Sequence, residues 1–210
     1  MFITFEGVEG AGKTTQIARL ASRFRAEGRG DVLSTREPGD GPLGSELRRL
    51  ALHPPPGITV EPRAELLMML ADRAQHVGQV IRPHLASGGI VLCDRFTASS
   101  LAYQGYGRGL DLAEIARLND YATDSLRPDL TLLLDLDPAI GLARQNERNV
   151  MEAESLAFHE RIRVGFRELA AQEPKRWVVV DAWRSAGDVE GDVWGAVSKA
   201  NIGISKRAYP

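Results

Sequence analysis

The feature that most constrains this chain is a glycine-rich motif near its N-terminus, with the spacing G-x-x-x-x-G-K-[ST]. It consists of Gly7, Val8, Glu9, Gly10, Ala11, Gly12, Lys13 and Thr14, followed by Thr15. The apolar run 2–5 precedes it, and a helical pattern with Ile17, Leu20 and Phe24 on one face follows it. The motif therefore occupies a turn from a strand into a helix, where free backbone N–H groups favour an anion.

This turn has the chemistry of a nucleotide phosphate site. Its glycines let the backbone curl so that successive N–H groups point at phosphate oxygens. Lys13 would reach the β- and γ-phosphates, and the Thr14 hydroxyl would bind Mg²⁺. We therefore predict that residues 7–15 bind ATP together with Mg²⁺. The motif alone leaves kinases, GTPases and mechanical ATPases open.

The bulk composition excludes several classes of protein. With 210 residues, 43% hydrophobic and 26% charged, the chain suits one soluble domain spanning 1–210. Its net charge of −2 argues against a general nucleic-acid binder. No signal-type segment or run of about 20 apolar residues is present. With Cys93 as the one cysteine, we expect a cytoplasmic protein without nucleic-acid or membrane partners.

Short apolar runs alternate with amphipathic helical patterns along the whole chain. The expected strands are 2–5, 31–35, 90–93, 130–136 and 177–180. The helical patterns carry Leu43, Leu47 and Leu50; Leu67, Leu70, Val77 and Ile81 after Pro62; Ile115 and Leu118 after the capping pair Asp111 and Glu114; Phe158, Ile162 and Phe166; and Val189, Val193 and Val197. Such alternation predicts an α/β fold with a parallel sheet covered on both faces. Residues 201–210 follow no pattern, so we expect a loose tail.

A charged pair, Asp94 and Arg95, follows the buried-strand pattern at 90–93. Ligands of open parallel sheets bind beyond the carboxyl ends of the strands, so this pair should face the same crevice as the glycine-rich turn. The Asp94 carboxylate can support Mg²⁺, and the Arg95 guanidinium can hold a phosphate through two hydrogen bonds. The pair therefore indicates a second phosphate, on an acceptor.

At this point the sequence resembles the bacterial thymidylate kinases, which are P-loop nucleoside monophosphate kinases. The matching stretches are the glycine-rich turn and residues 35–39, 71–73, 94–96, 99–105, 127–131 and 134–136, so the similarity spans roughly residues 1–182. The resemblance implies a P-loop kinase fold with a central five-stranded parallel sheet and a short mobile lid. It also implies transfer of the γ-phosphoryl group of MgATP to dTMP, for dTTP synthesis, and a homodimer formed by the helices after Pro62 and Asp111.

The resemblance also assigns an acceptor site. Arg95 would hold the dTMP phosphate with Arg36 or Arg48, and Arg73 would hydrogen-bond a thymine carbonyl. Tyr103 would lie where a 2′-hydroxyl would be, which favours deoxyribose, and Glu9 would position the acceptor sugar. The remaining substrate-binding positions are Pro38, Met69, Ser99, Ser100 and Gln104.

The glycine-rich turn has no arginine for the transition state, so a lid must supply one. The segment 141–152 is the expected lid, with Arg144 as the first candidate and Arg148 as the second. Related enzymes often read Asp-Arg-hydrophobic-Glu where this chain has residues 149–152. That departure leaves Glu152 as the remaining carboxylate, which we also consider as an Mg²⁺ ligand.

A second departure concerns the base, because many relatives have a stacking phenylalanine at the position of Met69. A thioether packs over a ring with more freedom, which favours looser choice among pyrimidine 5-substituents. Three alternatives to a dTMP kinase therefore stay open: a pyrimidine deoxynucleoside monophosphate kinase with relaxed base choice, a regulatory ATP-binding protein, and a catalytically degraded relative. The N-K-x-D motif of GTPases is absent.

Overall fold

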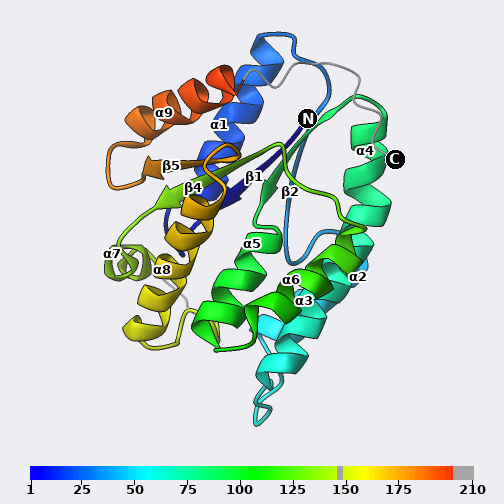
Figure 1. The fold of residues 1–210 in the computed structure, drawn as a ribbon, viewed down its shortest axis with the longest axis vertical. Helices are drawn as coiled ribbons and strands as arrows, with labels where there is room; N and C mark the ends of the chain where they lie inside the picture. The colour runs from blue at the N-terminus through cyan, green and yellow to red at the C-terminus, as the bar shows by residue number, and fades with distance from the viewer. Residues whose placement is uncertain (146–148, 201–210) are drawn as a thin grey trace.

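A computed structural model describes residues 1–145 and 149–200. Its centre is a five-stranded parallel sheet in the order β2-β3-β1-β4-β5 (Figure 1). The strands are β1 Phe2–Glu6, β2 Val32–Arg36, β3 Ile90–Asp94, β4 Leu130–Asp135 and β5 Trp177–Asp181. All five expected strands are confirmed, as is the α/β class.

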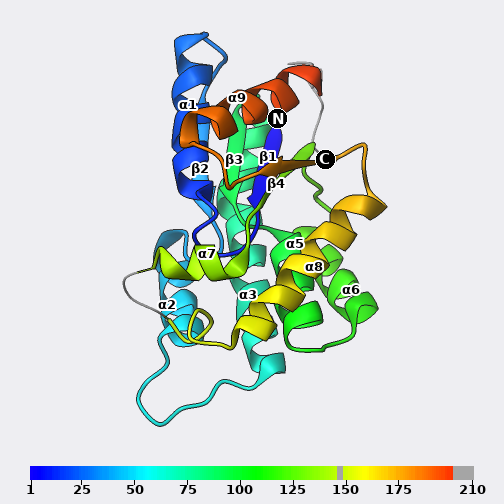
Figure 2. The same cartoon turned by 90° about the vertical axis from the view of Figure 1, so that its left-hand side faces the viewer.

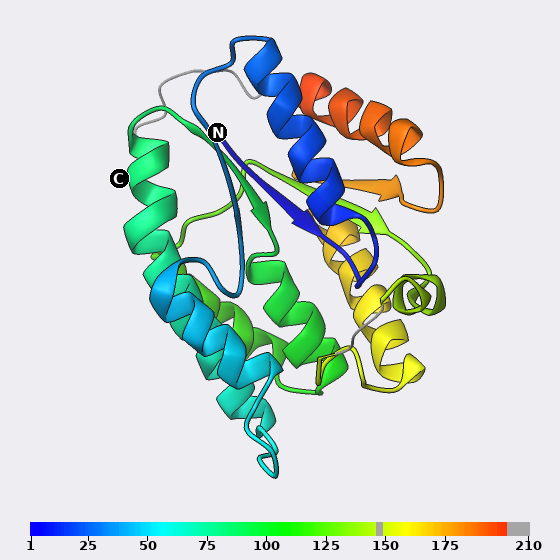
Figure 3. The ribbon, with the colours of Figure 1, turned by 180° about the vertical axis from the view of Figure 1, so that it is seen from behind.

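Helices cover both faces of this sheet, and each face takes alternate strand residues. The helical elements are α1 Lys13–Ala26, α2 Gly41–Leu52, α3 Pro62–His76, η1 Val77–Ile81, α4 Arg82–Ala86, α5 Thr97–Ser100, η2 Leu101–Gly107, α6 Leu112–Thr123, α7 Pro138–Ala143, α8 Leu156–Gln172 and α9 Ala186–Lys199. Helices α1 and α9 lie on one face, and α4, α5 and α8 on the other (Figures 1 and 3). Ile3 and Phe5 pack in the core cluster that includes α1, whereas Phe2 packs with η1 and α4.

The helix that begins at Pro62 runs through three consecutive helical segments and ends at Ala86. It passes from α3 through the π-helical turn η1 into α4, and Leu70, Val77 and Ile81 are buried as expected. Leu67, however, is 58% exposed, so its predicted place in the core is wrong. The predicted cap of α6 is confirmed, because the Asp111 side chain accepts a hydrogen bond of 2.7 Å from the Glu114 N–H.

The apolar face expected for α2 is also wrong. Leu43 and Leu50 are 49% and 38% exposed, while Gly44 and Ala51 are buried. The reason is a close approach to α3, since a Cβ on Gly44 would lie 2.5 Å from the Asp72 carboxylate. Small residues therefore form the contact, and Leu43 and Leu50 turn outward.

The C-terminal ends of the strands meet one edge of the sheet, where the functional groups gather. Figure 2 shows α7 crossing this edge beside the start of α1. Gly141 of α7 packs so closely that a Cβ on it would lie 2.1 Å from the Glu9 carbonyl oxygen. Within the described residues, no helix is long and apolar enough to cross a membrane.

Candidate active site

The glycine-rich turn leaves β1 and enters α1 through backbone conformations that favour glycine. Gly10 has φ 68° and Gly12 has φ 87°. The turn is tied to β3 from two sides: the Arg95 N–H donates to the Phe5 carbonyl at 2.9 Å, and the Thr14 hydroxyl donates to Asp94 Oδ2 at 3.1 Å. The two predicted phosphate sites therefore lie together at one sheet edge.

Lys13 sits inside the turn with 7% of its surface exposed. Its Nζ donates to the Gly7 and Val8 carbonyls, at 3.1 and 2.9 Å. Burial, and then the neighbouring Arg95 guanidinium, lower the pKa of Lys13 to about 8. A bound phosphate would relieve both effects, so the turn is electrostatically prepared for an anion.

A cleft of about 660 Å³ opens beside the turn, a size suited to a nucleotide. Residues predicted from the sequence to bind ATP, phosphate or Mg²⁺ line it: Glu9, Gly10, Gly12, Lys13, Thr14, Thr15, Arg36, Arg48, Asp94, Arg95, Arg144 and Glu152. Arg144 Nη1 donates to the Gly10 carbonyl at 2.8 Å, which brings this candidate to the turn. Arg148 lies outside the described residues.

Three arginines face one another where this cleft meets a second, smaller pocket. Burial, followed by the charges of Arg36 and Arg95, lowers the pKa of Arg48. Arg48 and Arg95 line both pockets, and Arg48 also donates to the Pro38 carbonyl at 2.9 Å. Like charges held this closely favour an anion between them.

The Arg95 guanidinium is fixed in place before any ligand binds. Its backbone adopts φ 71°, its Nη1 donates to the Gly7 carbonyl at 3.0 Å, and its Nη2 donates to Glu9 Oε1 at 3.2 Å. Burial alone would lower the pKa of Arg95, but the neighbouring Tyr103, Glu9 and Asp94 raise it above its ordinary value. The Arg95 side chain therefore stays positively charged, and its hydrogen bonds to Gly7 and Glu9 fix the direction in which the guanidinium points.

The residues at the mouth of the turn fit a hard divalent cation. The Thr14 hydroxyl lies against Asp94, and Asp94 Oδ1 is buried without a hydrogen-bond partner in the described part of the chain. Hydroxyl and carboxylate oxygens are the donors that Mg²⁺ prefers. Glu152 lines the same cleft, but its Oε2 accepts the Asn149 N–H at 2.9 Å.

The smaller pocket joins apolar walls to a few polar groups, the usual character of a base site. Its lining includes Glu9, Pro38, Arg48, Leu52, Met69, Arg73, Arg95, Ser99, Ser100, Tyr103, Gln104, Met151 and Glu152. The structure thus brings Met69, Ser99, Ser100, Tyr103 and Gln104 together, although η1, α4 and β3 separate α3 from α5 and η2 in the sequence. Leu52 and Met151 were not predicted, because nothing in their local sequence marks them.

Arg73 lines this pocket but is largely committed to the protein. Its Nε donates to Glu37, its Nη1 to Ser100 and Asn119, and its Nη2 to the Phe96 carbonyl, at 2.6 to 3.0 Å. These bonds use four of the five guanidinium N–H groups. Arg73 therefore supports the pocket wall, and its predicted hydrogen bond to a thymine carbonyl stays a prediction.

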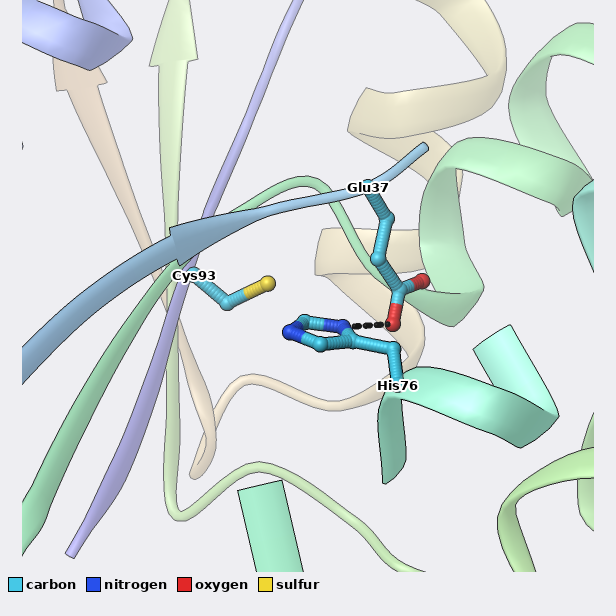
Figure 4. Close-up of side chains that lie close together, drawn as sticks. All are labelled: Glu37, His76 and Cys93. Carbon is cyan, nitrogen blue, oxygen red and sulfur yellow. Dashed lines mark hydrogen bonds and ion pairs between the residues drawn. The ribbon is translucent and has the colours of Figure 1, made fainter. Parts of the chain in front are cut away.

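Behind the pocket, Glu37, His76 and Cys93 place a carboxylate, an imidazole and a thiol within 4.8 Å of one another (Figure 4). His76 Nδ1 lies 2.9 Å from Glu37 Oε1, and its Nε2 lies 2.7 Å from the Thr35 hydroxyl. Burial raises the pKa of Cys93 well above its ordinary value, which keeps the thiol protonated. Because both imidazole nitrogens are engaged and the thiol is neutral, this group suits a hydrogen-bond network better than a metal.

The wall formed by Met151 is held from behind. Arg108 pairs with the buried Glu65 at 3.0 Å and with Glu154, and its Nη2 lies 3.3 Å from Met151 Sδ. Gln104 also donates to Glu65, at 2.8 Å. Arg108 was not among the predicted site residues. Arg108 stands in a glycine-rich stretch, and nothing in the local sequence predicts that it supports the pocket wall.

Comparison with known proteins decides the family. A family profile described as Thymidylate kinase matches residues 5–193. The chain belongs to the thymidylate kinase family. The thymidylate kinase of Solidesulfovibrio magneticus is 52% identical over 95% of this chain and 99% of its own. The thymidylate kinase of Deinococcus radiodurans is 50% identical over 95% of this chain and 97% of its own.

A solved thymidylate kinase structure, from Ehrlichia chaffeensis, shares the fold. Its TM-score is 0.78 at 35% identity, over 94% of this chain and 98% of that one. The thymidylate kinase resemblance and the P-loop kinase fold expected from the sequence are thereby confirmed. Members of this family are nucleoside monophosphate kinases with ATP as donor, so this chain is a nucleotide phosphotransferase.

The bounds of the expected lid, residues 141–152, stay a prediction, but its described residues lie beside both sites. Gly141 and Leu142 are buried in α7 against the phosphate turn, and Arg144 follows as the C-cap residue of that helix. The turns from 149 onward then return to the base pocket, where Met151 is 5% exposed. The described flanks of this thymidylate kinase segment thus contact both nucleotide sites.

Proposed function

We propose that this enzyme transfers the γ-phosphoryl group of ATP to the phosphate of dTMP, giving dTDP. The observation that carries the proposal is the position of Arg95. It lines the donor cleft and the base pocket alike, and its guanidinium is already fixed by Gly7 and Glu9. An acceptor without a phosphate would bring no charge to balance Arg36 and Arg48, which lie beside the ion pair of Arg95 with Glu9.

The donor phosphates lie in the turn formed by residues 7–15, where Lys13 and the backbone N–H groups neutralise their charge. Thr14 and Asp94 hold Mg²⁺, with Glu152 as a further candidate. When bound, the ion draws negative charge from the transferring group. Arg144, which contacts the turn through Gly10, supplies positive charge to the transferring group, and the second candidate, Arg148, lies outside the described residues.

Transfer is direct and in line, because the acceptor phosphate oxygen is itself the nucleophile. Arg95 and Arg48 hold that phosphate facing the turn, and Lys13 stabilises charge on the transferring phosphoryl group. Positioning and positive charge carry the reaction, since phosphoryl transfer has a loose transition state. No covalent enzyme intermediate is needed.

The base pocket supports a pyrimidine deoxynucleotide. Met69, Met151 and Leu52 offer apolar walls, and Ser100, Gln104 and Arg73 offer hydrogen-bonding groups. Tyr103 is 5% exposed and donates to Glu9 Oε1 at 2.5 Å, which fixes its ring beside the expected sugar and leaves little space for a 2′-hydroxyl. Relaxed base choice is the second candidate, favoured by methionine rather than an aromatic ring at position 69.

The chain works as one domain spanning 1–210 and forms a homodimer. The proposed contacts are α3 and α6, which leave Leu67 and Leu112 exposed. The protein acts in the cytoplasm, on free nucleotides rather than nucleic acid or membranes.

The test is ATP consumption with Mg²⁺ and a set of acceptors: dTMP, dUMP, dCMP, ribothymidine 5′-monophosphate, thymidine and none. We expect turnover with dTMP and loss of about 100-fold in kcat/KM for Arg95→Ala. Arg117→Ala is the matched control, since Arg117 is 73% exposed and pairs only with Glu114 in the described structure. ATP loss that ignores every acceptor would instead favour a regulatory or degraded protein.

A further inference from the structure

We propose that His159 is a positioning residue for Glu9, holding its carboxylate in the orientation that the acceptor requires. The inference deepens the proposed dTMP kinase function and rests on it. His159 belongs to the first turn of α8 and is completely buried. Its Nδ1 lies 3.4 Å from Glu9 Oε2.

The two oxygens of Glu9 have different surroundings. Oε1 accepts the Tyr103 hydroxyl at 2.5 Å and the Arg95 Nη2 at 3.2 Å. Oε2 is buried and accepts no hydrogen bond from the described residues, and His159 is the basic side chain that faces it. His159 therefore decides which way the second oxygen turns.

Both ring nitrogens of His159 are also buried without a hydrogen-bond partner in residues 1–145 and 149–200. Leaving several buried polar atoms unpaired costs free energy, about 1–3 kcal/mol for each group. Such atoms persist where a ligand or a small shift completes them. The 3.4 Å separation needs only a few tenths of an ångström to become a hydrogen bond.

The backbone of His159 is held firmly enough to act as a support. Ser155 caps α8, with its hydroxyl accepting the Phe158 N–H at 3.3 Å and its carbonyl accepting the His159 N–H at 3.3 Å. The Phe158 ring packs edge-on to the imidazole at 5.4 Å. The ring consequently cannot turn away from Glu9 without disturbing the start of α8.

The charged groups around Glu9 leave its second oxygen as the one that still lacks a hydrogen-bond donor among the described residues. Burial would raise the pKa of Glu9, but contact with His159 and the charges of Arg95 and Lys13 lower it below its ordinary value. Glu9 is thus an anion with two cations toward the solvent side. An imidazole N–H behind it orients the carboxylate and fits a space closed by Phe158.

Three variants test the role: His159→Phe, which keeps a ring but no donor; His159→Gln, which keeps a donor; and Glu9→Gln. We expect His159→Phe to lower kcat/KM for dTMP about tenfold or more, with KM for ATP unchanged. His159→Gln should recover activity to within about threefold of the parent. Equal losses in the Phe and Gln variants would overturn the proposal.

A double-mutant cycle separates positioning from packing. If His159 acts through Glu9, adding His159→Phe to Glu9→Gln should change kcat/KM for dTMP less than about twofold. An undiminished effect in the Glu9→Gln background would mean that His159 only fills space. Absence of dTMP turnover in the unmodified protein would be a different failure, that of the proposed function itself.

A measurement on the unmodified protein covers the case in which His159→Phe does not fold. In ¹⁵N–¹H spectra of the histidine rings, dTMP should shift the His159 signals. Those of the exposed His53, which lies outside both pockets, should stay unchanged. His159 signals that ignore saturating dTMP would contradict the proposal.

Discussion

Arg108 Nη2 lies 3.3 Å from Sδ of Met151, so the methionine that lines the base pocket is held by a guanidinium anchored on the buried Glu65. The usual freedom of a thioether is thereby reduced. The part of the pocket wall that Met151 forms is consequently less mobile than a methionine in the sequence alone would indicate.

Met151→Ala should raise KM for dTMP about five- to tenfold with a smaller effect on kcat, because the apolar contact is made before and during transfer. Initial-rate kinetics with varied dTMP would measure it. Met68→Ala is the matched control, since Met68 neighbours Met69 on α3 but does not line the pocket. Equal effects at both positions would place the loss in general packing rather than base binding.

Asp94→Asn should raise the Mg²⁺ concentration needed for half-maximal activity by about tenfold or more, because a carboxylate ligand becomes a neutral amide. Activity measured against Mg²⁺ at constant ATP gives the value. Asp124→Asn serves as the control, with a carboxylate that is 94% exposed. An unchanged Mg²⁺ requirement in Asp94→Asn would remove Asp94 from the ion site.

ATP affinity should weaken as the pH rises above about 8, the lowered pKa of Lys13. Bound phosphates favour the charged lysine, so its pKa is higher in the complex and binding takes up a proton once the free lysine has lost it. The dissociation constant should therefore rise with pH, up to about tenfold per unit. Calorimetric titrations with ATP from pH 7 to 9.5 should show this rise of the dissociation constant in the control variant Arg144→Ala. The rise should be absent in Lys13→Met.

The buried carboxyl of Glu6 should make stability depend on pH. Burial raises its pKa from 4.5 to about 7, against the opposing hydrogen bond from Ser99 and the charge of Arg95. A raised pKa means that the folded state binds more protons between these values. The contribution of Glu6 is then complete below pH 4.5 and is lost as the pH rises through about 7.

We therefore expect the free energy of unfolding of the parent, minus that of Glu6→Gln, to fall by about 3 kcal/mol between pH 4.5 and 7.5. Denaturant titrations at several pH values measure this difference, and contributions from Asp72 and His76 cancel in it. Glu46→Gln, at a side chain that is 65% exposed, should show no such trend. A flat difference for Glu6→Gln would mean that Glu6 stays ionised throughout.

The strands and the phosphate turn could be predicted because their signals are local. A short apolar run predicts a strand, and glycines at fixed spacing before Lys13 predict the phosphate turn, each from a few neighbouring positions. The predicted burial of Leu43, Leu50 and Leu67 was wrong because α2 and α3 meet through Gly44 and Asp72, a relation between two helices. Periodicity indicates an apolar face but not which neighbour will cover it.

The acceptor site likewise contains some residues that the local sequence predicts and others whose roles depend on distant contacts. Arg95 could be predicted from its place after a strand, whereas the commitment of Arg73 to Glu37 and Asn119 depends on contacts 36 and 46 residues away. His159 did leave a signal, since it falls on the same helical face as Ile162 and Phe166, and a polar residue on a buried face needs a partner. That partner, Glu9, lies at the other end of the chain.

The sheet order has a consequence for how the protein is made. β1 is synthesised before both of its neighbours in the sheet, since β3 and β4 begin only at Ile90 and Leu130. Its apolar side chains and backbone groups therefore lack their native partners until first β3 and then β4 have been synthesised. A nascent chain of this kind would benefit from a chaperone, and the nucleotide site at the end of β1 cannot be complete before β3 and Arg144 have also been synthesised.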